Sequence, residues 1–149
     1  MAALFFEDVK PGDSFKSRPY GVTQEAIVAF AREFDVQPFH LDQAAANQSV
    51  FGGLAASGWH TAAIAMRLFT TGPICFEGGA VGLGVDELRW PAAVRPGDEL
   101  QLETEILEVR PSKSKPQHGI IRIRNLMTNQ KGEVVLSYTA NALVPRRPA

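Results

Sequence analysis

The apolar positions in the first half of this chain recur with a helical period. Four residues at i, i+3, i+4 and i+7 form one apolar face: Ile27, Phe30, Ala31 and Phe34. Thr23 precedes them as a predicted N-cap, and Glu25 complements the positive end of the helix dipole. Pro38 pushes the residue before it out of the α region, so this helix is predicted to end before Gln37.

Two further helices are predicted downstream. Asp42 can cap a short helix that runs to Asn47 or Ser49 and is broken by two glycines. The segment 57–70 is apolar on nearly every side, with Arg67 as its only charged side chain. Such a helix is expected to be buried almost all round. Gly72 and Pro73 end it.

The second half of the chain alternates between apolar and polar residues, as strands do. A first strand is predicted at 14–22, and four more at 80–90, 99–109, 119–127 and 133–144. Short turns join the later strands, which favours an antiparallel sheet. Because its apolar face needs a cover, the sheet is expected to wrap around the buried helix. This α+β arrangement is the hotdog fold, predicted as a single domain over residues 1–149.

Composition narrows the classes of function. Fifteen basic and sixteen acidic residues give a net charge of −1, which offers no electrostatic case for nucleic acid or an anionic membrane surface. The apolar start is too short for a secretory signal, and no window approaches a membrane span, so a cytoplasmic protein is expected. Cys75 is the sole cysteine, which excludes an intrachain disulfide; it is expected to be buried. Trp59 and Trp90 are expected in the core rather than in a pocket.

Asp35 and His40 form the first candidate for chemistry, five residues apart around Pro38. A carboxylate at a helix C-terminus faces the negative end of the dipole, which should raise its pKa and suit a general base. A solvated helix-end Asp35 and a structural His40 are the alternatives. Held together on a stiff loop, the two side chains can move a proton to and from water.

Ser57 and Gly58 form the second candidate, at the start of the apolar helix. The free N–H groups of a first helical turn favour negative charge beside them and can stabilise a developing oxyanion. Ser57 can instead be a simple N-cap, and both interpretations can hold together.

With these residues in view, the segment 30–60 resembles MaoC-like dehydratases and R-specific enoyl-CoA hydratases. That family has Asp, Asn, Pro and His where this chain has Asp35, Gln37, Pro38 and His40. The pair Phe51–Gly52 and the later turn Val94–Asp98 match as well. The resemblance implies a hotdog (de)hydratase acting on a 2-enoyl or 3-hydroxyacyl thioester, with CoA as part of the substrate and no other cofactor. It also implies a homodimer or higher homo-oligomer with the site at the subunit interface.

The resemblance implies a role for each matching residue. Asp35 would activate the attacking water, and His40 would bind that water and return a proton to Cα. The N–H of Gly58 would polarise the thioester carbonyl. Three residues depart from the family pattern: Phe34 stands for Gly, Gln37 for Asn and Ser57 for His. Phe34 and Gln37 are expected to reshape or shorten the acyl pocket.

Two other functions remain open. A hotdog thioesterase is the enzymatic rival, although no acidic residue occurs at 59–71, on the predicted central helix. A non-catalytic acyl-binding subunit is the other rival, and it would need neither Asp35 nor His40. His60 is expected to be a hydrogen-bonded core or interface residue. Lys113 and Lys115 are expected in a solvated loop, with contact to CoA phosphates as the alternative. The histidines lack the spacing of metal ligands.

Overall fold

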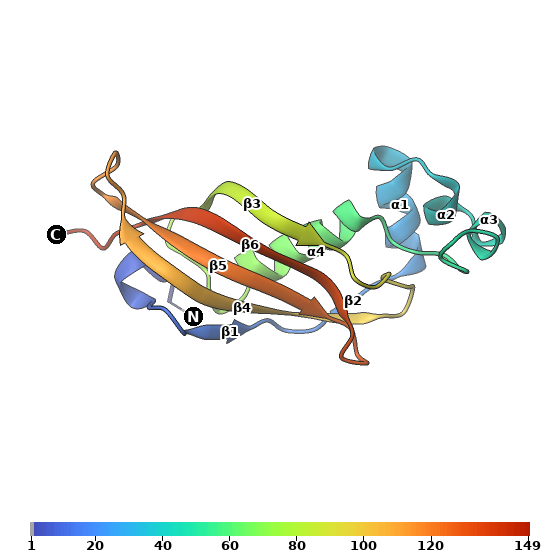
Figure 1. Ribbon diagram of the computed structural model, residues 1–149, viewed down its shortest axis with the longest axis horizontal. Coiled ribbons are helices and arrows are strands. Elements are labelled where there is room, and N and C mark those ends of the chain that lie inside the picture. Colours follow the sequence, from blue (N-terminus) through green and yellow to red (C-terminus); the bar gives the residue numbers. More distant parts are fainter. Residues whose placement is uncertain (1) are drawn as a thin grey trace.

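A computed structural model describes residues 2–149 of the chain. Figure 1 shows a curved antiparallel sheet lying along one long helix, with three shorter helices at one end. The helical elements are η1 (Phe6–Asp8), α1 (Gln24–Phe34), α2 (Pro38–Leu41), α3 (Gln43–Asn47) and α4 (Gly58–Thr70). The strands are β1 (Ser14–Lys16), β2 (Tyr20–Gly21), β3 (Val81–Arg89), β4 (Glu99–Pro111), β5 (His118–Thr128) and β6 (Val134–Pro145).

The sheet has six strands in the order β1-β4-β5-β6-β3, with β2 also paired to β4. Every strand pair is antiparallel, as the alternating sequence predicted. The single strand predicted at 14–22 is wrong in detail, because β1 and β2 are separate short pieces against the same partner. The four later strands agree with prediction to within about two residues.

The core lies between α4 and the inner face of the sheet. Leu102 is paired with Met127, and Ile106 with Ile123, and all four side chains are buried. Ile64 and Leu68 of α4 belong to the same apolar cluster. Full burial of each such side chain is worth about 1.5–3 kcal/mol, so this contact fixes the helix on the sheet.

Helix α4 is not buried all round, contrary to prediction. The sheet covers one side of it, while Trp59, Met66 and Arg67 remain exposed on the other. The edge strand β3 is also exposed and presents Val81, Leu83 and Val85 to solvent. Cys75, predicted to be buried, is exposed in the connection from α4 to β3. Within residues 2–149, no helix is both long enough and apolar enough to cross a membrane.

Three side-chain caps fix the helices that surround the candidate site. Thr23 accepts from the Ala26 N–H, Asp42 accepts from the Ala45 N–H, and Ser57 accepts from the Trp59 N–H. These are the cap positions that the sequence predicted. The segment after α1 was predicted to be a loop, but Pro38 begins the additional short helix α2. Proline suits a first helical position because the N–H it lacks would have no partner there.

Candidate active site

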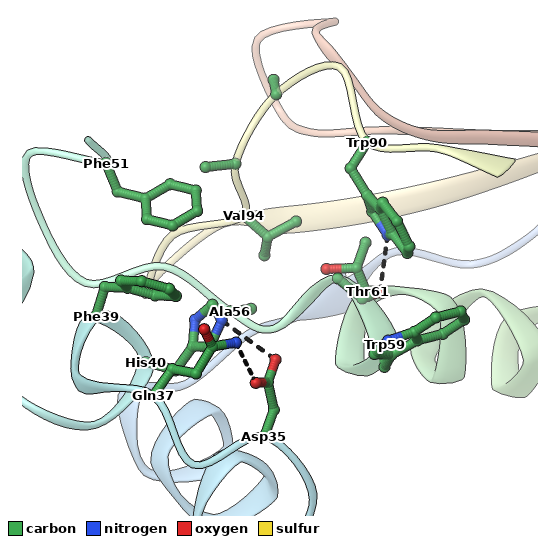
Figure 2. A pocket seen from close by; sticks show the side chains of 13 residues that line it. Asp35, Gln37, Phe39, His40, Phe51, Ala56, Trp59, Thr61, Trp90 and Val94 are labelled. Carbon is green, nitrogen blue, oxygen red and sulfur yellow. Dashed lines mark hydrogen bonds and ion pairs between the residues drawn. The ribbon is translucent and has the colours of Figure 1, made fainter. Parts of the chain in front are cut away.

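Asp35 and His40 meet where α1 gives way to α2 (Figure 2). Asp35 is the C-cap of α1, and His40 lies on the single turn of α2. The Nε2 atom of His40 is 3.3 Å from the Asp35 Oδ2 atom. His40 is 4% exposed, so the protein encloses almost the whole imidazole.

The other ring nitrogen of His40 has a defined partner. Nδ1 lies 2.6 Å from the carbonyl oxygen of Ala55. A carbonyl oxygen only accepts hydrogen bonds, so Nδ1 carries a proton and donates it to Ala55. The exchangeable position is therefore Nε2, the atom that faces Asp35.

The pKa of Asp35 was predicted to be raised, and the structure corrects this. Burial does raise the pKa of the Asp35 carboxyl, but the net direction is downward. Hydrogen bonding from the Ser57 and Gln37 side chains and the charge of His40 outweigh burial. Asp35 is consequently ionised across the neutral range and is a weaker base than the helix dipole alone suggests.

Gly58 begins α4 beside this pair and lines the same cavity. Ser57 accepts from the Trp59 N–H, whereas the Gly58 N–H forms no hydrogen bond with another residue of 2–149. An unpaired donor at a helix N-terminus favours a negatively charged oxygen beside it.

The cavity has a volume of about 350 Å³. Its polar wall contains Gln37 and the dyad, the pair formed by Asp35 and His40. The rest is mainly apolar: Phe39, Phe51, Ala56, Trp59, Trp90, Ala92, Ala93 and Val94. Apolar walls with a few polar groups are typical of small-molecule sites. Within residues 2–149, no three His, Cys, Asp or Glu side chains converge as a possible metal site.

Trp59 and Trp90 were predicted to be in the core, and this is wrong. They are 60% and 40% exposed, and their rings meet edge to face at the cavity, with centroids 5.3 Å apart (Figure 2). The Trp90 indole N–H donates to the Gly58 carbonyl at 2.8 Å. A Cβ on Gly58 would lie 2.6 Å from the Trp90 Cε2 atom, which explains why glycine occupies this position.

The other sequence candidates divide into two groups. Gln37 lies in the cavity wall and its amide donates to Asp35, and Ser57 is fully buried next to Gly58. Phe34 does not line the cavity; it is 66% exposed and its ring contacts Phe30. The structure therefore places Phe34 outside the lining of this cavity, although it was expected to reshape an acyl pocket.

The structure also tests the predictions for His60 and for the two lysines. His60 is buried as predicted, stacked on Phe30 with ring centroids 4.8 Å apart, but its Nδ1 atom has no partner within residues 2–149. Lys113 and Lys115 are exposed on the loop between β4 and β5, as predicted. That loop lies at the opposite end of the molecule from α1–α3 (Figure 1).

This fold and this site define a family, the MaoC-like domain proteins. The family model matches residues 7–127, so the chain belongs to it. A MaoC-like dehydratase from Rhodospirillum rubrum, known from its crystal structure, is 53% identical. It superposes with a TM-score of 0.93, over 99% of this chain and 100% of that one. The uncharacterized protein YdeM of Bacillus subtilis is 30% identical over 91% of this chain and 94% of its own length.

Two more solved structures bear on the fold. The R-hydratase PhaJ1 from Pseudomonas aeruginosa is 25% identical with a TM-score of 0.81, over 97% of this chain and 88% of that one. Rv0216 from Mycobacterium tuberculosis has a double hotdog fold. It aligns with 98% of this chain and 45% of its own, at a TM-score of 0.80 and 20% identity. The α+β hotdog fold predicted from the sequence is thus confirmed.

Proposed function

We propose that this protein adds water to a 2-enoyl thioester, or removes it from the matching 3-hydroxyacyl thioester. CoA is the proposed carrier, as part of the substrate, with no further cofactor. The observation that carries the proposal is the buried His40, held at Nδ1 by Ala55 and directed at Asp35 by Nε2. Membership of the MaoC-like family and similarity to an R-hydratase support the same class of reaction.

Asp35 is the proposed general base. Ionised Asp35 accepts a proton from water as the water oxygen bonds to Cβ of the enoyl group. Its lowered pKa makes it too weak a base to deprotonate free water. The proton transfer therefore accompanies carbon–oxygen bond formation, when the attacking water becomes acidic.

His40 is the proposed proton donor, acting through Nε2. The Ala55 carbonyl holds Nδ1, so Nε2 alone is positioned to bind water and give a proton to Cα. In this scheme His40 starts with a proton on both ring nitrogens and Asp35 starts ionised. After both transfers Asp35 is protonated and His40 is neutral. Passage of the proton from Oδ2 to Nε2, across the 3.3 Å that separates them, restores the starting state.

Gly58 is the proposed oxyanion donor. Attack at Cβ moves electron density onto the thioester oxygen, which gains enolate character. The free Gly58 N–H and the positive end of the α4 dipole stabilise that charge. Since the donor is backbone at a packed helix start, it costs no reorganisation during the reaction.

The substrate is proposed to carry a small or medium acyl group. A cavity of about 350 Å³ is near the lower end of the range for ligand sites, about 300–1,000 Å³. Phe39 and Phe51 bound the cavity near His40 (Figure 2). Trp90 bounds it at Gly58, to whose carbonyl its indole N–H donates.

The first experiment follows loss of enoyl absorbance with a panel of 2-enoyl-CoA thioesters, with free thiol measured in parallel. Asp35→Asn and His40→Asn should each slow hydration about 10²–10⁴-fold. Glu105→Gln is the matched control, because its carboxylate pairs with Arg124 at the surface of β4 and does not line the cavity. Thiol release would support the thioesterase instead, and an unchanged rate in both dyad variants would refute the mechanism. Binding of the thioester without conversion would indicate an acyl-binding subunit.

A homodimer is proposed as the assembly. Val81, Leu83 and Val85 of the edge strand β3 are each more than half exposed, as are Trp59 and Met66 of α4. β3 pairs with β6 on one side only, and the free side of an apolar edge strand can pair with a strand of another chain. Light scattering should give twice the chain mass, and Leu83→Lys should lower it, while Lys115→Glu on the distant loop should not. A monomeric wild type would contradict the proposal.

A further inference from the structure

The segment Phe51–Ala56 carries several parts of the proposed site but belongs to no helix or strand. Phe51 packs against Phe39 in the cavity wall, with ring centroids 5.1 Å apart. The Ala55 carbonyl holds His40, and Ala56 leads directly into the start of α4. The position of this segment therefore affects both the cavity wall and the imidazole.

Arg95 holds the segment through three carbonyl groups. Its Nη1 atom donates to Gly53 at 2.9 Å and to Leu54 at 3.3 Å, and Nη2 donates to Phe51. Val94, the preceding residue, accepts from the Ala56 N–H at 2.9 Å. Two adjacent residues thus bind the segment along its length.

Arg95 is itself fixed by a turn of the sheet. Its N–H donates to Asp98 Oδ2 at 2.8 Å, and Asp98 Oδ1 accepts from Gln130 at 2.9 Å. Asp98 is 7% exposed. The anchor therefore stands on the turn before β4 and on the β5–β6 loop, outside the segment that it holds.

The Arg95 guanidinium donates hydrogen bonds to carbonyl groups rather than to a carboxylate. Within residues 2–149, Arg95 forms no ion pair, whereas Arg122 and Arg124 pair with Asp86 and Glu105. Arg95 is partly buried, so the three carbonyls compensate its lost hydration. The planar Arg95 guanidinium places its donors in fixed directions on separate nitrogens, whereas lysine carries its three donors on one freely rotating nitrogen.

We infer that Arg95 is a positioning residue for the hydration site: by fixing Phe51–Ala56, it sets the Ala55 carbonyl and through it the orientation and tautomer of His40. The inference rests on the proposed function for its kinetic consequence only. Leu54, which Arg95 binds, adjoins Ala55, so a shift there is passed directly to the His40 hydrogen bond. A displacement of about 1 Å at a reacting group can cost about 100-fold in rate.

The test compares wild type with Arg95→Lys and Arg95→Met, with Arg110→Lys as the matched control because Arg110 is exposed at the far end of β4. Hydration of a 2-enoyl-CoA substrate should lose about 10–100-fold in kcat in both Arg95 variants, with little change in KM. A third variant, Arg95→Ala, removes the guanidinium group altogether. Millimolar guanidinium should restore part of its rate and leave the rate of Arg110→Lys unchanged.

The second readout does not depend on turnover. Nitrogen-15 NMR of His40, recorded at a pH where its imidazole is neutral, should show the proton on Nδ1 in wild type and a mixture of tautomers in Arg95→Lys. A wild-type protein that hydrates no thioester would refute the proposed function. The NMR measurement would then still test whether Arg95 sets the tautomer of His40. An unchanged His40 tautomer, or a kcat equal to that of Arg110→Lys in an active enzyme, would overturn the inference. If Arg95→Met fails to fold, Arg95→Lys carries both measurements.

Discussion

The Nδ1 atom of His40 lies 2.6 Å from the carbonyl oxygen of Ala55, fifteen residues further along the chain. This bond occupies Nδ1 in holding the ring and leaves Nε2 for the proposed proton transfer. Loss of each nitrogen should therefore have a different consequence, and substitutions at His40 can separate the two.

His40→Asn and His40→Leu test this division. Asparagine can keep a donor near the position of Nδ1, whereas leucine leaves the buried Ala55 acceptor unpaired. The unpaired acceptor should lower the free energy of unfolding by about 1–3 kcal/mol. Both variants lack Nε2 and should lose hydration about equally, by about 10²–10⁴-fold. Thermal melting at one pH should rank wild type, then His40→Asn, then His40→Leu. Equal melting temperatures for the two variants would show that the Ala55 bond contributes nothing to stability.

The lowered pKa of Asp35 predicts a pH dependence of stability. Unfolded Asp35 titrates near its ordinary value, about 3.9, and the folded group titrates below that. Ionised Asp35 therefore contributes stability that is fully present above about pH 4 and is lost as pH falls through the lower, folded value. Denaturant unfolding of wild type and Asp35→Asn across this range should show their difference shrinking only below about pH 4. A difference that already declines between pH 7 and pH 5 would contradict the lowered pKa.

Much of this fold follows from local sequence patterns. Thr23, Asp42 and Ser57 cap their helices because a cap is decided within three residues. The strands follow from alternation, and the pairing of Asp35 with His40 follows from a short segment stiffened by Pro38. Each of these features depends on near neighbours in the chain.

The features that the sequence did not reveal depend on distant contacts. Trp90 binds Gly58 across 32 positions, and Arg95 binds the Phe51 carbonyl across 44. The direction of the Asp35 pKa depends on Ser57, which the helix-dipole argument did not include. One side of α4 stays exposed because the sheet contacts only the other side. Sequence periodicity finds an apolar helix but does not say which part of it the same chain will cover.

His60 predicts a second pH dependence, with a different range. Burial lowers the pKa of His60, and its Nδ1 atom has no partner within residues 2–149. Below the ordinary His value, about 6.5, the unfolded chain gains a proton that the folded chain resists. Stability should therefore fall as pH decreases from about 7 to 5. His60→Leu should lose less stability over this range than wild type. Parallel pH curves for His60→Leu and wild type would contradict the effect of burial.

The contact between Gly58 and Trp90 gives a prediction for a pair of substitutions. A Cβ on residue 58 would stand 2.6 Å from Trp90 Cε2, so Gly58→Ala must displace the indole and weaken its bond to the Gly58 carbonyl. Overpacking of this kind costs about 1–3 kcal/mol. Gly21→Ala is the control, because a Cβ there meets nothing within 4 Å and the backbone has no positive φ.

Adding Trp90→Leu to Gly58→Ala should relieve the clash. The double variant should then melt above the temperature expected from the sum of the two single effects, since residues in contact are not additive. Thermal melting of the four proteins in this cycle measures the coupling between the two positions. A coupling of zero would mean that Trp90 does not rest on Gly58 in solution. A double variant more stable than the sum of the single effects would explain why the proposed oxyanion donor belongs to glycine. The Trp90 indole occupies the space that a side chain at position 58 needs.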